Sequence, residues 1–161
     1  MIRSIQWVIF SLPLLMATES FVGEVTAIYD GNTIEVSTKD KGVYRVVLMG
    51  IDCPELSQAY GNEAKDFLAQ WLLHREVLVR IHGKDRARNY VGVVLMDEGQ
   101  DVRLALLQEG LAWTSERDAI PELEMIRLEA VRDKKGLWND EAAVAPWIFR
   151  RQQTMLEAKS R

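Results

Sequence analysis

The side chains that could do chemistry gather in two stretches of the sequence. Two carboxylates, Asp52 and Glu55, flank a Cys-Pro pair, and three cations, Lys84, Arg86 and Arg88, share one charged loop. A basic patch of this kind neutralises phosphates, so it predicts binding of nucleic acid that weakens as salt is added. The plainer alternatives are a carboxylate pair that caps a segment and faces water, and loop charges that are simply solvated.

Cysteine, histidine and total charge exclude several other functions. The single cysteine, Cys53, leaves no intramolecular disulfide, CxxC redox pair or thiolate zinc site. Its acidic neighbours should raise the pKa of the thiol, which predicts an unreactive side chain. The two histidines, His74 and His82, offer few imidazoles for a metal site or a catalytic triad. The 161 residues carry a formal net charge of −4, so the composition itself does not indicate a nucleic-acid binder, and the length fits one domain.

Residues 1–20 have the pattern of a secretory signal peptide. Arg3 gives a basic start, residues 5–17 form a mostly apolar run, and small residues precede a cut before Phe21. The run is too short to span a membrane, which takes roughly 20 apolar residues. We therefore expect a periplasmic or secreted protein with no membrane anchor after cleavage. An uncleaved anchor or a core strand is the alternative.

Five strands and three helices are expected to position the charged groups. Alternation of apolar and polar residues over 33–38 is typical of a strand, and the apolar spacing over 62–75 forms the stripe of an amphipathic helix. A helix after the third strand and two more at the end are typical of the OB-fold, a five-stranded Greek-key barrel, so the predicted fold class is mainly β with α. The expected strands span residues 21–29, 33–38, 43–51, 77–81 and 90–96, and the expected helices span residues 62–75, 101–109 and 121–135.

The last residues of the chain are expected to form a solvated tail. From residue 150 onward there are four basic residues against one acidic residue, Glu157. A charge run of this kind more often faces water than carries a function.

Seven short motifs give the sequence its specific character. They are DGNT at 30–33, GIDCPE at 50–55, YGNEA at 60–64, GKDR at 83–86, GLAW at 110–113, GLW at 136–138 and APWIFRR at 145–151. In this order and spacing they resemble the staphylococcal nuclease (thermonuclease) family, and the last four resemble its bacterial branch. The resemblance runs from Val22 to Arg151, which implies a nuclease-like domain over 21–151 followed by a basic tail over 152–161.

The resemblance implies a calcium-dependent phosphodiesterase that cleaves DNA and RNA. A hard cation held by carboxylates acts as a Lewis acid on the scissile phosphate, and a further carboxylate activates water. Guanidinium forks bind the phosphate and stabilise the charge of the transition state. The family uses two aspartates, one glutamate and two arginines for these roles. Carried over by position, Asp52 is a metal ligand and Glu55 is the general base.

Three of these five family positions are substituted in this chain. Asn32 stands where the family has its other metal-binding aspartate, and an uncharged amide should weaken the binding of Ca²⁺. Val47 and Asn89 stand at the two arginine positions. Losing one preorganised electrostatic donor costs on the order of 10²–10³ in rate, and here both arginines are missing. We therefore expect weak or no Ca²⁺ binding.

Arg45 and Arg88 are the candidate substitutes for the missing arginines. Arg45 lies two residues before Val47, on the same face of the strand, and Arg88 lies next to Asn89. Catalysis tolerates little misplacement of such groups. The sequence therefore predicts an exported monomer with lost or strongly reduced hydrolysis, which keeps a face for nucleic acid or a protein partner. The alternatives are an active calcium-dependent endonuclease with Glu55 as its base, and an envelope protein with no ligand at this face.

Overall fold

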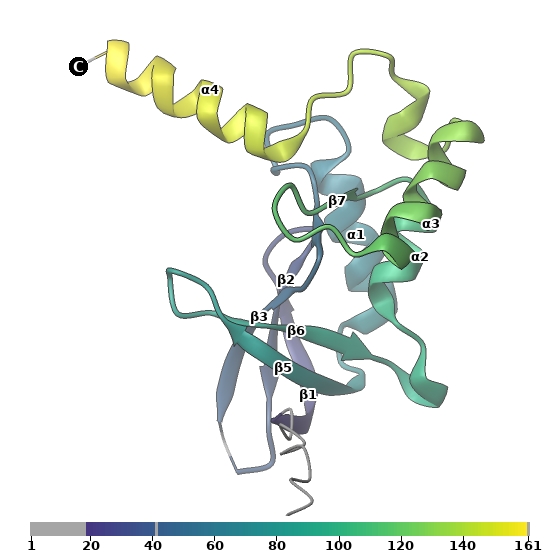
Figure 1. The fold of residues 1–161 in the computed structure, drawn as a ribbon. Coiled ribbons are helices and arrows are strands. Elements are labelled where there is room, and N and C mark those ends of the chain that lie inside the picture. Colours follow the sequence, from purple (N-terminus) through teal and green to yellow (C-terminus); the bar gives the residue numbers. More distant parts are fainter. Residues whose placement is uncertain (1–18, 41, 161) are drawn as a thin grey trace, which may run out of the picture.

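Five strands close into a barrel, and helices gather at one end of it (Figure 1). The computed structural model describes residues 19–40 and 42–160. The order around the barrel is β1-β2-β3-β6-β5, and all neighbours are antiparallel except β3 and β6, which are parallel. The barrel strands are β1 (Ser20–Ile28), β2 (Thr33–Ser37), β3 (Val43–Leu48), β5 (Glu76–Lys84) and β6 (Tyr90–Leu95). The predicted fold class, mainly β with α and built on a five-stranded OB-like barrel, is confirmed.

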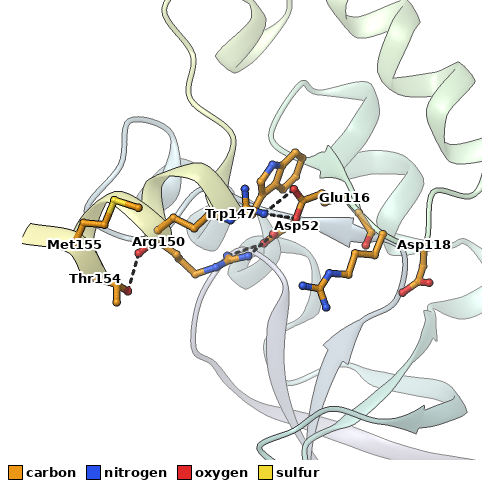
Figure 2. A pocket seen from close by; sticks show the side chains of 10 residues that line it. Asp52, Glu116, Asp118, Trp147, Arg150, Thr154 and Met155 are labelled. Carbon is orange, nitrogen blue, oxygen red and sulfur yellow. Dashed lines mark hydrogen bonds and ion pairs between the residues drawn. The ribbon is translucent and has the colours of Figure 1, made fainter. Parts of the chain in front are cut away.

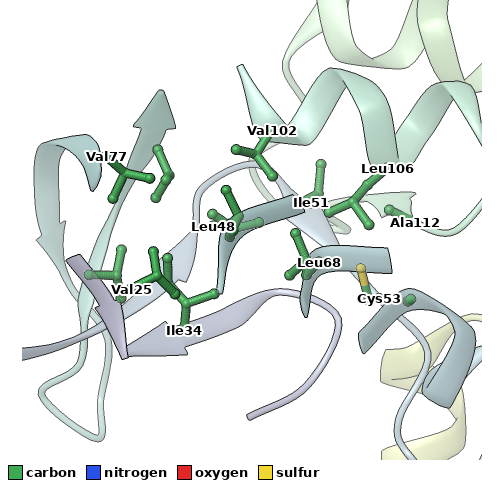
Figure 3. Packing of buried hydrophobic residues seen from close by; sticks show 14 of the residues in the cluster. Val25, Ile34, Leu48, Ile51, Cys53, Leu68, Val77, Val102, Leu106 and Ala112 are labelled. Atoms are coloured by element: carbon green, nitrogen blue, oxygen red, sulfur yellow. The ribbon is translucent and has the colours of Figure 1, made fainter. Parts of the chain in front are cut away.

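One apolar core joins the barrel to the helices that cover its end. On β2 the alternating residues Ile34 and Val36 are fully buried, as the period of a strand requires. Helix α1 (Gly61–Leu72) adds a buried stripe that includes Leu68, and α2 (Val102–Gln108) adds Leu106. Figure 3 shows side chains from both helices in the same cluster as the barrel residues.

The third strand is shorter than predicted, and this difference matters for the site. It ends at Leu48 and does not continue to Ile51, because Gly50 takes a left-handed conformation with φ +79°. A Cβ atom at Gly50 would lie 2.7 Å from the Ile120 side chain, so the turn favours glycine. After it, β4 (Ile51–Asp52) leaves the barrel and pairs with β7 (Trp113–Thr114). The turn therefore carries Asp52 away from the barrel wall.

The described residues contain four α-helices instead of the three that were expected. Helix α1 ends at Leu72, before the predicted end, because Leu73 is extended. Helix α3 (Pro121–Arg132) begins at its proline as predicted. The additional helix is α4 (Pro146–Lys159), which also begins with a proline and extends away from the barrel in Figure 1. Two short 3-10 turns, η1 (Asp97–Gly99) and η2 (Gly136–Asn139), complete the structure.

The predicted signal peptide falls almost wholly on residues 1–18, which lie outside the described residues. The first strand begins at Ser20, which pairs with Arg80, and the Ile81 amide donates a hydrogen bond to the Glu19 carbonyl at 2.8 Å. Among residues 19–40 and 42–160, no helix is long and apolar enough to cross a bilayer.

Candidate functional site

Two of the sequence motifs meet at a small cleft of about 130 Å³ beside the barrel. The turn between β1 and β2 supplies one wall, and the segment from β4 to Glu55 supplies the other. A third contribution comes from α4, far away in the sequence. The lining residues are Asp30, Asn32, Thr33, Asp52, Cys53, Pro54, Glu55 and Arg150. We call this space the carboxylate cleft.

The β1–β2 turn is held by its own side chains and by the segment that it faces. The Asp30 carboxylate accepts a hydrogen bond from the backbone amide of Asn32 at 2.9 Å, which is the local bond that favours Asx residues in turns. The side-chain oxygen of Asn32 accepts from the backbone amide of Cys53 at 3.2 Å. A Cβ atom at Gly31 would lie 2.6 Å from the Cβ atom of Cys53, so only glycine allows this approach. Asn32 thus ties the turn to the carboxylate segment.

Cys53 is part of the core rather than of the reactive surface. Its side chain is buried, and its Sγ atom donates to the Gly31 carbonyl at 3.2 Å. Burial, reinforced by the nearby charges of Asp52 and Asp30, raises the pKa of the thiol well above its ordinary range. The pKa is raised as predicted, but the main cause is burial rather than the acidic neighbours.

A guanidinium from α4 lines the carboxylate cleft and is bound to both of the predicted site carboxylates. Arg150 donates through both terminal nitrogens to Asp52, at 3.1 and 2.7 Å, and through Nη1 to Glu55 at 2.7 Å. Figure 2 shows its side chain reaching from the helix to Asp52. The hydrogen bonds to Asp52 and to Glu55 raise the pKa of the guanidinium. The expectation that the chain is merely solvated from residue 150 onward is therefore wrong for Arg150.

One face of α4 directs this arginine to the cleft. Arg150, Arg151 and Thr154 lie three, four and seven residues after Trp147, so the four residues share a face of the helix. The Trp147 ring packs edge-on against Trp113 with 5.7 Å between centroids. Arg151 donates to both carboxylate oxygens of Glu116 at 2.7 Å.

Gln58 links the segment before α4 to the carboxylate cleft. Its side-chain oxygen accepts from the Glu55 amide at 2.8 Å, while its nitrogen donates to the Val144 carbonyl at 3.0 Å. The same side chain thus ties the backbone at Glu55 to the backbone just before α4.

A second, larger cleft lies between α4 and the loop that follows β7. It encloses about 550 Å³ and shares Asp52 and Arg150 with the carboxylate cleft. Its other lining residues are Ser115, Glu116, Arg117, Asp118, Trp147, Arg151, Thr154 and Met155. Figure 2 shows Glu116 close to the helix, where it pairs with Arg151, and Asp118 farther from the helix. Arg150 therefore separates the two clefts.

The two candidate substitutes for the missing arginines lie elsewhere. Val47 pairs with Thr33 in β2, and Arg45 lies one pleat away, opposite Glu35. The Arg45 guanidinium stacks 3.9 Å from the centroid of the Tyr29 ring, and the Tyr29 hydroxyl donates to Glu35 at 2.7 Å. These neighbours hold Arg45 on the outer face of the barrel, and it is not among the residues that line the carboxylate cleft.

Asn89 has a structural role in the loop between β5 and β6. Its backbone amide and its side-chain nitrogen both donate to the Asp85 carboxylate at 2.8 Å. Arg88, just before it, is left-handed with φ 68°. Lys84, Arg86 and Arg88 are exposed on this loop, and the Lys84 ammonium lies 4.3 Å from the centroid of the Tyr90 ring. The predicted basic patch therefore forms a cationic loop that packs against the ring of Tyr90. It is not part of the lining of the carboxylate cleft.

The oxygens of the carboxylate cleft do not fit the calcium ion that the resemblance implies. Calcium takes six to eight oxygen ligands. Here the side-chain oxygen of Asn32 is engaged by Cys53, and Asp52 and Glu55 both face the Arg150 guanidinium. Within the described part of the chain, no group of three or more His, Cys, Asp and Glu residues is arranged to hold a metal.

Of the residues at this site, sequence reasoning missed Arg150. It lies inside the APWIFRR motif that contributed to the resemblance, and this was the available signal. The role of Arg150 was missed because the cations from residue 150 onward were interpreted together as a solvated run. Arg150 lies 98 positions after Asp52 and 95 positions after Glu55 in the chain, and no local pattern predicts a contact between residues so far apart.

Known proteins with similar sequences indicate the family to which the chain belongs. The family described as "Staphylococcal nuclease homologue" matches residues 45–140, more than half of the chain. The "Uncharacterized endonuclease" of Escherichia coli O157:H7 is 36% identical over 146 residues, covering 90% of this chain and 94% of that protein. The "Micrococcal nuclease" of Shigella flexneri is 34% identical over 161 residues, covering 93% of this chain and 92% of that protein. "Protein ParB" of Escherichia coli is 38% identical over 141 residues, covering 81% of this chain and 79% of that protein. With its barrel and its seven motifs, the chain belongs to the staphylococcal nuclease family.

Proposed function

We propose that this chain is a nuclease-family protein that binds nucleic acid and hydrolyses its phosphodiester bonds slowly or not at all. The observation that carries the proposal is how the guanidinium group beside Asp52 and Glu55 is bound. Arg150 is the one arginine among the residues that line the carboxylate cleft, and it is bound to both Asp52 and Glu55. It therefore compensates the carboxylates and is not directed at a phosphate.

The charge balance of the carboxylate cleft supports this proposal. Its lining includes three carboxylates, those of Asp30, Asp52 and Glu55, against the guanidinium of Arg150, a formal charge of −2. A phosphodiester that gains negative charge in the transition state needs cationic donors aimed at it. The cleft instead repels a phosphate, and the Glu55 oxygen that accepts from Arg150 is not free to orient a water molecule.

Binding is assigned to the cationic loop over 84–88. Lys84, Arg86 and Arg88 are exposed there, and the only carboxylate between them, Asp85, is turned to Asn89. Proteins bind single-stranded nucleic acid with cations that contact its phosphates and with aromatic rings on which its bases stack. We therefore favour nucleic acid over a protein as the binding partner. Binding in this role does not require hydrolysis.

A working endonuclease is the second candidate function. Asp52 and Glu55 are retained side by side, and two relatives carry the names "Micrococcal nuclease" and "Uncharacterized endonuclease". In that case Glu55 acts as the general base, and a guanidinium has to reach the phosphate. Arg45 would then have to leave Tyr29, and Arg150 would have to leave both carboxylates.

Cleavage of fluorescent single-stranded DNA in calcium tests the loss of hydrolysis. We expect the parent to be silent, and the restored triple variant Asn32→Asp, Val47→Arg and Asn89→Arg to cleave at least about 10²-fold faster than the parent. Activity of the restored variant would place the loss at these three positions. Cleavage by the parent that disappears in Glu55→Ala would overturn the proposal in favour of the second candidate.

Retention on single-stranded DNA tests the binding role separately. The triple variant Lys84→Ala, Arg86→Ala and Arg88→Ala should lose salt-dependent retention. A matched control removes the same charge elsewhere on the exposed surface, at Arg75, Lys134 and Lys135. If both variants are retained like the parent, the cationic loop is not the binding surface.

We further propose that the protein is exported and that residues 1–20 are removed. The support is the sequence pattern of that segment, with its basic start and apolar run. Mass spectrometry of protein from the periplasm or the medium should find an N-terminus at Phe21. An intact Met1 there, or protein confined to the cytoplasm, would contradict export by cleavage.

A further inference from the structure

Helix α4 supplies a positive charge to two carboxylates that both lie within hydrogen-bond distance of one guanidinium. The side chain of Asp52 is 19% exposed, that of Glu55 is 39% exposed, and Arg150 lies between them at hydrogen-bond distance from both. Like charges held this close disfavour one another unless a cation compensates them. In this structure the compensating cation belongs to the chain itself.

We propose that Arg150 is the built-in counter-ion of the carboxylate cleft, and that docking of α4 through Arg150 and binding of a divalent cation to Asp52 and Glu55 exclude each other. The inference rests on the site argued above, but it does not require that the protein binds nucleic acid. It explains why the family carboxylates, although retained, do not fit a resident calcium ion in this arrangement.

Arg150 and a divalent cation exclude each other because they use the same carboxylate oxygens. Its guanidinium uses both oxygens of Asp52 and one oxygen of Glu55. Carboxylate oxygens are the ligands that a hard divalent cation prefers, and a guanidinium at the same atoms would repel that cation. The cation can bind well only after Arg150 has withdrawn.

The rest of α4 is held loosely enough for the helix to withdraw. Residues 151–160 are all exposed, and Pro146 is the one buried residue of the helix. Besides Arg150, the helix is held by the half-buried Trp147, which packs on Trp113, by the half-buried Phe149 and by the Arg151–Glu116 pair. Exposed ion pairs are individually weak, so occupation of the carboxylates by another cation would remove a large part of what holds the helix.

Calorimetric titration of the purified protein with CaCl₂, without nucleic acid, measures the competition directly. We expect Arg150→Gln to bind calcium about 10-fold more tightly than the parent, within the usual range of coupling between two ligands. The matched control is Lys159→Gln, which removes the same charge from the last turn of α4, where the side chain is exposed. Its calcium affinity should stay within about twofold of the parent, since coupling of several-fold is expected only at the shared carboxylates.

Because coupling is reciprocal, calcium should also loosen α4. Amide hydrogen exchange over Pro146–Lys159 should speed up when calcium is added to the parent. In Arg150→Gln the exchange should already be fast, and in the variant Asp52→Asn with Glu55→Gln it should be fast and indifferent to calcium. This second variant keeps the test decisive if Arg150→Gln alters the helix for another reason.

Equal calcium affinity of the parent and Arg150→Gln, including no binding by either, would overturn the proposal. Tight calcium binding by the parent without faster exchange in α4 would overturn it as well. Neither result touches the retention of single-stranded DNA by the loop over 84–88. Loss of that binding role would equally leave the calcium titration unaffected, so the two proposals fail independently.

Discussion

The buried pair of Asp101 and Arg103 at the start of α2 allows a quantitative prediction about stability. Asp101 is the N-cap of α2, and it accepts from the Arg103 backbone amide at 3.0 Å and from the Arg103 side chain at 2.7–3.2 Å. Arg103 also donates to the Met49 carbonyl at 2.9 Å, directly before the Gly50 turn that leads to Asp52. The pair therefore connects α2 to the segment that positions the carboxylates.

The perturbation is Asp101→Asn, which keeps a capping acceptor but removes the charge. The side chain of Arg103 is only 9% exposed and that of Asp101 is 14% exposed, so the guanidinium would remain almost buried without an anion. Breaking a buried pair in this way typically costs 3–5 kcal/mol, and the bond to Met49 and the residual exposure reduce the expected loss to about 2–4 kcal/mol. Asp101→Ala should lose about 1 kcal/mol more, because the cap is then also gone.

Denaturant unfolding of a double-mutant cycle measures this effect. Arg103→Met alone should cost about 1 kcal/mol, because Asp101 keeps its bond to the backbone at the N-terminus of α2. The double variant Asp101→Asn with Arg103→Met should be more stable than the sum of the single losses predicts, by about 1–3 kcal/mol. If Asp101→Asn unfolds within about 0.5 kcal/mol of the parent, the reasoning from buried charge is refuted.

Three further predictions concern the elements around the site. The hydrogen bond from Arg127, with a second from β7, lowers the pKa of Glu124 below its ordinary value of 4.5, so the stability that it contributes is present above that value and is lost as the pH falls through the lowered pKa. Urea unfolding should therefore show Glu124→Gln destabilised at pH 7, with the difference from the parent vanishing in acid; a difference that is constant with pH would contradict this. Gly50→Ala should lower the free energy of unfolding by about 1–3 kcal/mol, and by more than Gly99→Ala, since both glycines are left-handed but only a Cβ at Gly50 meets another side chain. Cys53 should react with a thiol reagent only upon unfolding, and fast labelling of the native protein would show that it is not buried.

The elements of the barrel could be predicted because each has a local signal. The alternation at Ile34 and Val36 appears in the structure as two fully buried side chains in β2. The helix expected over residues 101–109 begins as predicted, because Asp101 caps α2 by accepting a hydrogen bond from the backbone amide of Arg103. Signals of this kind need only a few neighbouring residues, so the sequence contains them.

The geometry of the site could be predicted only in part, because it depends on contacts between distant segments. The motif with Asp52 and Glu55 and the turn with Asn32 meet as the resemblance implies. The interruption of the third strand was missed, because the apolar run continues to Ile51 and only the left-handed turn at Gly50 breaks it.

The role of Arg150 is not evident from the local charge pattern, although the residue lies within the APWIFRR motif. A charged residue in a basic C-terminal run is typical of a solvated surface. What selects it is the spacing that places it on the same face of α4 as Trp147, together with the packing of that tryptophan on Trp113. Both facts become visible only once the helix is placed in the fold.

The most direct test of the central claim is a time course of fluorescence anisotropy with labelled single-stranded DNA in calcium. If the protein binds nucleic acid without efficient hydrolysis, the anisotropy rises on mixing, falls when salt is added, and otherwise stays constant for hours. A steady fall in anisotropy that is absent in Glu55→Ala would show hydrolysis at the carboxylate cleft and contradict the account.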